Sequence, residues 1–331
     1  MTTPEWGLIL MLLWEHAVDN GFQRNETSVT FYATMNGRLD WKEGHVSDII
    51  FILAMNGLVW GLIIALIALG LSIIFGLLDI INVAHGDFFM VGTVFAWTVI
   101  LLTGNFWLAF LIVPLIGMLL GSFVERVVIR PVENSAALSI VATFGLSLIL
   151  QEGVRATFGA TPKRILDPIG MTIPVMGFDY QVYRLFAAAI SIAAIIAFFL
   201  FLHRTKFGTW MRSVRQDRDT AIAMGVPANR IFVVTFGLGT ALAMFGGVVA
   251  APITSVEFRL GLDVLPLCFM AVIIGGLGNL PGTVAAAVLL AFVEGILTSF
   301  TEPTTARIIS LLFMSAVLLL RPQGIFARST G

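Results

Sequence analysis

Charged residues are scarce in this sequence of 331 residues. They make up 12% of the chain, against about 25% in a typical soluble domain, whereas 58% of the residues are apolar and the mean hydropathy is +0.97. Because an aqueous fold of this size has too little interior to bury so much apolar surface, the composition predicts an integral membrane protein. The net charge is -1, so no basic surface indicates nucleic acid binding.

Cysteine and lysine are also rare. The single cysteine, Cys268, excludes an intrachain disulfide and a cysteine cluster for a metal. The histidine His85 has no accompanying histidine, cysteine or carboxylate pattern, so no metal site is predicted. The lysines are Lys42, Lys163 and Lys206, and none follows a glycine-rich segment with the spacing of a nucleotide-binding loop. We therefore predict neither an enzyme nor a cofactor bound by this chain.

Uncharged stretches predict the membrane spans. Two of them are too long for one helix, and each contains a polar or glycine-rich break that divides it into two helices. The count is then eight or nine helices in an all-α, polytopic fold. No pair of carboxylates lies in the middle of a span, which counts against a proton-driven carrier. The uncharged stretches are 49–78, 88–124 with a break at 103–105, 135–151, 185–202, 231–256, 264–293 with a break at 275–282, and 308–320.

Residues 1–48 differ in composition from the rest of the chain. They are acidic, and their apolar run from Gly7 to Trp14 is too short to span a bilayer. No basic residue precedes this run and no small-residue cleavage site follows it, so we do not interpret it as a signal peptide. We expect residues 1–48 to be a non-spanning, extracytoplasmic extension and residues 49–331 to form the membrane domain.

Basic residues predict the orientation of the spans. With nine spans and an outer N-terminus, three groups of basic residues lie in the cytoplasm, and the acidic N-terminal segment and the loop at about 152–184 lie outside. That outer loop carries several basic residues, so the rule is not followed throughout. The three groups are Arg126 with Arg130, the segment from His203 to Arg218, and Arg321 with Arg328.

Short sequence motifs recur in the two halves of the membrane domain. The segment Val91–Val94 is matched by Pro281–Val284, and Arg130-Pro131 by Arg321-Pro322, at nearly the same offset. Such short motifs also recur by chance in apolar sequences. Together they predict a parallel internal repeat, with the solute path at its interface.

Two breaks in the apolar sequence are candidates for the solute path. The first is the segment from Ile81 to Asp87, and the second is the glycine-rich segment from Gly275 to Gly282. Interrupted backbone survives at membrane depth where it is buried in protein or lines a cavity. The alternatives are an ordinary turn with Asp87 capping the next helix, and a tight hairpin.

The segment at about 207–226 has the pattern of an amphipathic helix. Trp210, Val214, Ala221 and Met224 fall broadly on one face, although Asp217 interrupts it. Gly225 and the following proline end the helix. Chemistry alone allows either a surface helix or a docking element for a soluble partner.

These motifs together resemble the permease subunits of branched-chain (leucine/isoleucine/valine) amino acid ABC importers. The resemblance covers about residues 50–327. Permeases of urea and short-chain amide importers share the same sequence motifs. The extension at 1–48 is longer than we expect for this family. The landmarks are the word at 81–86, Glu125-Arg126, Arg130-Pro131-Val132, Phe207-Gly208 with the arginine-rich segment, Gly275–Gly278, Pro281-Gly282 and Arg321–Ile325.

The resemblance implies a permease in the bacterial inner membrane that works by alternating access. Its partners would be a second homologous permease or another copy of itself, two ATP-binding subunits that hydrolyse ATP with Mg²⁺, and an extracytoplasmic solute-binding protein. The segment at 207–226 then looks like the coupling helix that contacts the ATPase. The implied coupling residues are Arg212, Arg215, Asp219, Ala221 and Gly225.

The predicted substrate is a branched-chain or other hydrophobic amino acid. Apolar walls with few fixed charges suit a zwitterion whose charges meet backbone dipoles. Urea or a short-chain amide is the first alternative, and an ATP-independent channel or secondary carrier is the alternative of another class. The predicted path residues are Asn56, Gly57, Gly61, Asn82, His85, Gly86, Gly275, Gly276, Gly278 and Asn279.

Overall fold

The computed structural model describes residues 43–133, 135–175, 177–321 and 324. The chain divides into two units, residues 1–49 and 50–331, and the fold that follows is that of the second unit. Most of the predicted N-terminal extension, residues 1–42, lies outside the described residues.

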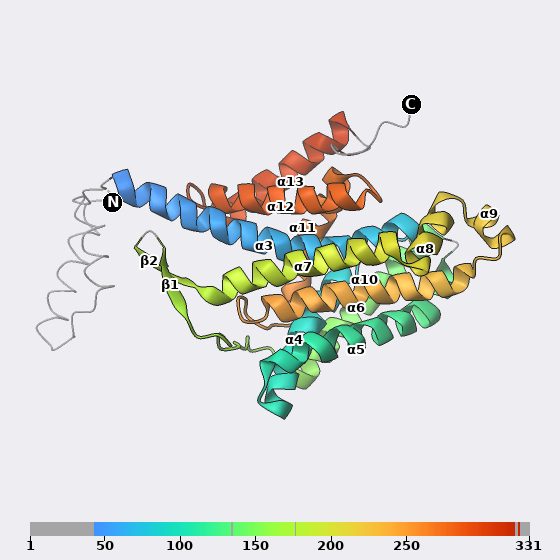
Figure 1. Ribbon diagram of the computed structural model, residues 1–331, viewed down its shortest axis with the longest axis horizontal. Coiled ribbons are helices and arrows are strands. Elements are labelled where there is room, and N and C mark those ends of the chain that lie inside the picture. Colours follow the sequence, from blue (N-terminus) through green and yellow to red (C-terminus); the bar gives the residue numbers. More distant parts are fainter. Residues whose placement is uncertain (1–42, 134, 176, 322–323, 325–331) are drawn as a thin grey trace, which may run out of the picture. The chain divides into compact units, whose positions relative to one another are not determined.

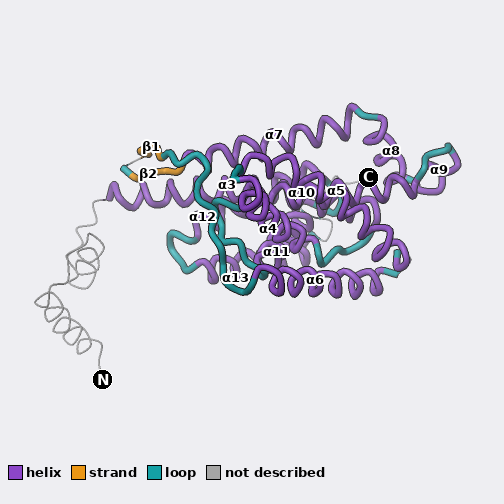
Figure 2. The backbone as a smooth tube through the Cα atoms, turned by 90° about the horizontal axis from the view of Figure 1, so that it is seen from below, coloured by secondary structure: helices purple, strands orange, loops and turns teal. Residues whose placement is uncertain are grey.

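Helices dominate the described part of the chain (Figures 1 and 2). Eight of them are long and apolar enough to cross a membrane, and the shorter apolar helix α11 is a ninth segment of the same character. These helices confirm the predicted polytopic all-α fold. They are α3 (Glu43–Leu78), α4 (His85–Thr103), α5 (Ala109–Val124), α6 (Ala136–Phe158), α7 (Val182–Arg204), α10 (Ala228–Ala250), α11 (Leu260–Gly275), α12 (Leu280–Leu297) and α13 (Pro303–Leu320).

Helix boundaries follow local chemistry. Helix α4 ends where Gly104 adopts a left-handed backbone conformation with φ of 69°, and its N–H bonds the carbonyl oxygen of Ile100. The side chain of Ser135 accepts a hydrogen bond from the N–H of Leu138 at the start of α6. Such caps satisfy backbone groups that have no partner within the helix. The predicted break at 103–105 is confirmed.

Two short strands lie outside the helices. β1 (Thr172–Val175) and β2 (Phe178–Gln181) pair antiparallel, with Thr172 opposite Gln181 and Val175 opposite Phe178. The hairpin lies in the loop that precedes α7, and Figures 1 and 2 place it at the end of the helices opposite α8 (Lys206–Gln216) and α9 (Arg218–Ala223). The loop also pairs with the segment after α10, because Lys163 and Val256 exchange backbone hydrogen bonds of 2.9 and 2.8 Å.

The core is centred on α3, α4 and α10. These helices are mostly buried, whereas less than a third of the residues of α5, α6, α7 and α13 is buried. Glycines allow the close approach of the central helices, since Gly70 of α3 meets the backbone of Gly239 in α10 and Gly92 of α4 meets Met244. Small residues of this kind are typical of helix contacts in membranes, where packing rather than water drives association.

The internal repeat stays a prediction. Helices α4 and α12 both run antiparallel to α3. His85 of α4 contacts Ile67 and the later Phe89 contacts the earlier Trp60. Likewise Thr283 of α12 contacts Ser72, and the later Gly295 meets the earlier Leu53. However, Gly92 lies in the interior of α4, whereas its proposed counterpart Gly282 lies in the first turn of α12. Their surroundings therefore differ.

Candidate functional site

The first break lies deep in the helical bundle. After α3 ends at Leu78, Asp79 turns with a positive φ of 54° and the chain folds back to start α4 at His85. The His85 ring lies against Gly70, which in turn meets Gly239 at the midpoint of α10. Irregular backbone at this depth requires partners within the protein, because lipid offers none.

Side chains of the break itself and of α6 supply these partners. The hydroxyl of Thr143 accepts a hydrogen bond from the N–H of Val83 at 3.2 Å and lies 3.3 Å from the carbonyl oxygen of Ile81. The amide oxygen of Asn82 accepts from the N–H of Ala84 at 3.1 Å. The break is therefore a defined, hydrogen-bonded structure.

Asp87 anchors the first turn of α4 to its neighbours. Its carboxylate accepts a hydrogen bond of 3.0 Å from Gln151 Nε2, and that amide also donates to Ser147 at 2.9 Å. Gly261 at the start of α11 packs directly against Asp87. The structure describes no side-chain hydrogen bond that caps the start of α4, so the alternative of Asp87 as an ordinary helix cap is wrong.

Two polar groups in this break have unused hydrogen-bonding capacity. His85 Nε2 lies 3.0 Å from the carbonyl oxygen of Ile67, so the Nε2 position donates and Nδ1 is an acceptor in the neutral ring. Among the residues that the structure describes, neither Nδ1 of His85 nor Nδ2 of Asn82 has a hydrogen-bond partner, and both atoms are buried. Buried polar groups without partners are rare and indicate a place where another group binds or where the structure changes.

The other predicted path residues of α3 and α4 lie in helix contacts. Gly57 and Gly61 face Ala291 and Val288 of α12, and Gly86 meets the backbone of Gly261. Nearer the hairpin end, Asn56 accepts a hydrogen bond of 3.1 Å from Arg184 of α7. In this conformation these glycines bring helices together, and their assignment to the path stays a prediction.

The second break separates α11 from α12. Gly276 and Gly278 have positive φ values of 91° and 77°, and Gly275 packs on the first turn of α12. The side chain of Asn279 caps α12 by accepting from the N–H of Gly282 at 3.3 Å. The predicted break is confirmed, and its residues from Gly276 to Gly282 line a cavity of about 960 Å³ beside α7 and α8.

The predicted coupling helix is two helices. Asp217 is extended, with φ of −157°, so it ends α8 and caps α9 by accepting from the N–H of Thr220. A hydrogen bond from the Thr220 hydroxyl, together with this backbone bond, lowers the pKa of the Asp217 carboxyl, so the cap is ionised at neutral pH. The prediction of one helical face through 207–226 is therefore wrong: Val214 and Ala221 are buried, but Met224 is 80% exposed.

The arginines of this segment have different surroundings. Arg212 donates a hydrogen bond of 2.5 Å to the carbonyl oxygen of Leu202, and the Arg215 guanidinium lies against Gly278 in the second break. Asp219 is exposed, and Gly225 has a positive φ of 84° with open space beside it. Arg215 thus connects α8 with the turn that precedes α12.

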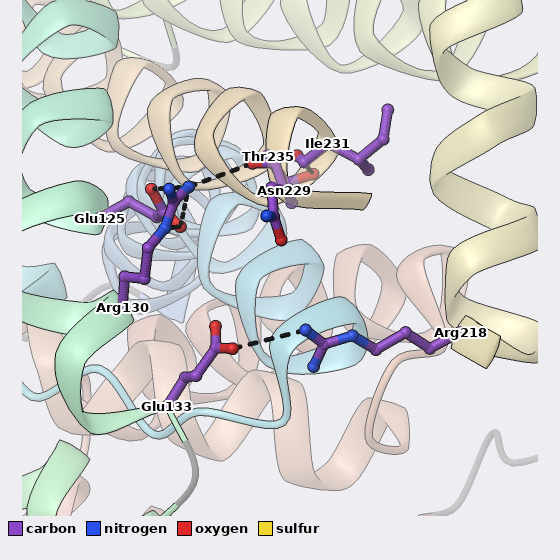
Figure 3. Close-up of polar contacts among 7 residues, drawn as sticks. All are labelled: Glu125, Arg130, Glu133, Arg218, Asn229, Ile231 and Thr235. Carbon is purple, nitrogen blue, oxygen red and sulfur yellow. Dashed lines mark hydrogen bonds and ion pairs between the residues drawn. The ribbon is translucent and has the colours of Figure 1, made fainter. Parts of the chain in front are cut away.

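A set of charged residues connects α9 and α10 with the end of α5 (Figure 3). Helix α5 continues as a π-helical turn, η2 (Glu125–Ile129), and a 3-10 turn, η3 (Arg130–Val132). Arg130 donates to both carboxylate oxygens of Glu125 at 3.2 Å and to the carbonyl oxygen of Asn229 at 3.3 Å. Arg218 of α9 pairs with Glu133 at 3.4 Å.

Sequence reasoning missed several of these polar residues. Glu125 and Arg130 served as landmarks of the resemblance, and their mutual contact is suggested by their spacing near one helix end. Thr143, Gln151 and Arg184 had no recognisable signal, because the partner of each is distant in sequence. Within the described ranges, no group of three or more histidine, cysteine or acidic side chains has the geometry to hold a metal ion.

Comparison with known proteins extends this picture. The family profile described as "Branched-chain amino acid transport system / permease component" matches residues 53–320. The high-affinity branched-chain amino acid transport system permease protein LivH of Escherichia coli is 27% identical over 293 residues, which cover 82% of this chain and 94% of that protein.

Two further relatives come from other organisms. The permease protein BraD of Pseudomonas aeruginosa, of a high-affinity branched-chain amino acid transport system, is 27% identical over 294 residues, which cover 83% of this chain and 94% of BraD. A probable LivH permease of Methanocaldococcus jannaschii is 24% identical over 286 residues, 82% of this chain and 90% of that protein. No solved structure matches this chain.

Proposed function

The chain belongs to the family of branched-chain amino acid transport system permease components, and from that premise we propose that it is the membrane-spanning permease of an ATP-driven importer. The transported solutes are branched-chain and other hydrophobic amino acids, which cross the inner membrane by alternating access. The names of the relatives favour this substrate class over urea or a short-chain amide. The chain itself catalyses no reaction, and ATP is bound and hydrolysed with Mg²⁺ by separate subunits.

The observation that carries this proposal is the position of α8 and α9. The two helices lie at one end of the membrane helices (Figures 1 and 2). From there Arg215 contacts the break before α12, and Arg218 pairs with Glu133 after α5. A partner that moves α8 and α9 therefore acts on two membrane-spanning parts of the protein at once.

We place the coupling surface on the exposed part of this segment. Asp219 and the turn at Gly225 are the docking residues for the ATP-binding subunits, with Ala221 buried beneath them. Arg212 and Arg215 contact the end of α7 and the second break, and transmit the movement. The proposed assembly contains a second homologous permease or another copy of this chain, two ATP-binding subunits and an extracytoplasmic solute-binding protein. The N-terminus then lies outside and the C-terminus in the cytoplasm.

The proposed path passes the first break. Asn82 and His85 are fully buried in this conformation, so the path there is closed and opens when the helices move. The start of α4 at this depth directs the positive end of a helix dipole into the bundle, which suits the carboxylate of a zwitterion. The second break, with Gly276, Gly278 and Asn279, is the moving element nearest to α8.

Purification from the native membrane tests the proposal. The chain is solubilised in detergent and isolated, and the proteins that accompany it are identified by mass spectrometry. An ATP-binding subunit together with a second permease is the expected result. The accompanying solute-binding protein is then titrated with leucine, urea and acetamide. Isolation of this chain alone, in a stable oligomer, favours a channel or secondary carrier instead.

A further inference from the structure

The cavity of about 960 Å³ has a distinctive chemical lining. It lies between the end of α7, helix α8 and the turn from Gly276 to Gly282, where the membrane-spanning part of α7 ends. Its ionisable lining residues are His203, Arg212 and Arg215, and none of the described residues around it is acidic. Because all three side chains are exposed, the cavity is open to its surroundings.

Arg215 is the central charge of this cavity. It makes no hydrogen bond or ion pair with any residue that the structure describes, although its guanidinium lies against the backbone of Gly278. Arg212 uses Nη1 for the carbonyl oxygen of Leu202 and retains further donors. A guanidinium presents donors in a planar fork that matches the oxygens of a phosphate.

The positive end of the dipole of helix α12 also lies at this cavity. The helix begins at the cavity with Asn279 as its cap, and its 18 residues give it a full dipole. The dipole favours an anion at this end, although Pro281 has no N–H and the N–H of Gly282 already donates to Asn279. The cavity therefore combines two arginines and a helix N-terminus without a compensating acid among the described residues.

The rest of the lining is apolar. Phe199, Leu202, Leu277, Leu280 and Pro281 form much of the wall. A row of exposed apolar residues on α7 leads away from it along the membrane-spanning length of the helix, at Ile192, Ile196 and Leu200. Acyl chains along this row would place a headgroup at the two arginines. We propose that the cavity binds the phosphate headgroup of an anionic phospholipid.

The solute itself fits this cavity less well. A branched-chain amino acid carries an ammonium group as well as a carboxylate, and the lining offers no acidic side chain for the ammonium. A basic pocket at the end of membrane helices is instead typical of anionic lipid sites. The inference does not depend on which solute the protein transports, and it assigns to Arg215 a role beyond contact with the second break.

Photolabelling tests the site directly. The purified full-length protein is placed in nanodiscs of phosphatidylcholine that contain a small fraction of photoreactive phosphatidylglycerol, and labelled peptides are identified by mass spectrometry. We expect labelling of peptides that contain residues 199–203 or 276–285. Replacement of Arg215 by Gln should reduce that labelling about fivefold, the effect of one basic residue near an anionic membrane surface.

Arg204 provides the matched control. It is exposed at the same end of α7 but does not line the cavity, so Arg204→Gln removes the same charge and should leave the labelling unchanged. Thermal unfolding in detergent verifies that both variants are folded. Equal labelling by a photoreactive phosphatidylcholine, equal loss in both variants, or displacement of the lipid by inorganic phosphate or by leucine would each overturn the proposal.

Discussion

His85 Nε2 lies 3.0 Å from the carbonyl oxygen of Ile67, so the first residue of α4 is joined to the interior of α3. That carbonyl belongs to a helix, and the imidazole adds a second hydrogen bond to it across the break at 79–84. The contact is one of the hydrogen bonds that hold the chain where it returns into the bundle after α3. It also leaves His85 Nδ1 as a buried acceptor that has no partner in the described structure.

Replacement of His85 by Ala tests this contact. The variant leaves a void beside Gly70 and removes the hydrogen bond to Ile67, so we expect the free energy of unfolding to fall by about 1–3 kcal/mol. Leucine uptake should fall further than the amount of protein in the membrane. The measurements are thermal unfolding in detergent and uptake normalised to protein. The conservative variant His85→Gln keeps a donor and should recover part of the stability; full uptake in His85→Ala would contradict a gating role for the break.

Substitution of Gly57 by Ala tests the contact between α3 and α12. A methyl group at this position would lie 2.6 Å from the carbonyl oxygen of Ala291, so the helices must separate to admit it. We expect Gly57→Ala to lower the free energy of unfolding by about 1–3 kcal/mol. Gly145 in α6 is the control, because no atom of the described residues beyond its own stretch of helix lies within 4 Å of its Cβ position. Gly145→Ala should raise stability by up to about 1 kcal/mol, since alanine favours helix. Equal effects of the two substitutions would show that α3 and α12 do not pack closely.

Substitution of Gly225 by Val tests the proposed coupling surface. The φ of 84° at Gly225 is a left-handed conformation that costs an L-residue about 1–2 kcal/mol. We therefore expect Gly225→Val to change the turn after α9 and to lower the ratio of transport to ATP hydrolysis in the assembled importer. Asparagine tolerates this conformation, so Gly225→Asn should retain a ratio near that of the native protein. A normal ratio in Gly225→Val would exclude this turn from coupling.

The ion pair of Arg218 with Glu133 tests the second connection of α9. Both side chains are partly exposed, so the pair contributes at most about 1 kcal/mol to stability. Glu133→Arg places two cations together. It should lower the ratio of transport to ATP hydrolysis several-fold, with little change in the temperature of thermal unfolding. The double variant Glu133→Arg with Arg218→Glu restores opposite charges and should recover the ratio of transport to ATP hydrolysis. Recovery would assign the effect to the ion pair and not to either residue alone. No recovery would contradict transmission through this contact.

The sequence by itself determined that the chain is a polytopic membrane protein and the order of its apolar helices, with a count of eight or nine. Hydropathy and charge are local properties, so the uncharged runs and the breaks at 103–105 and 275–282 were visible without a structure. The same reasoning failed at Asp217, where one helical face was extended through a residue that instead adopts an extended conformation and caps α9. A side chain that caps its own backbone competes with the helix, and periodicity alone does not show which one wins.

The tertiary structure alone decided which polar residues meet. Gln151 reaches Asp87 across 64 residues of sequence, and Arg184 reaches Asn56 across 128. The partners in each pair lie on different helices, and which residues meet depends on how the helices rotate and cross. Those angles follow from the close packing of glycines such as Gly70 on Gly239. Local pattern therefore predicts helices in a membrane, whereas the buried polar contacts between them depend on packing over the whole fold.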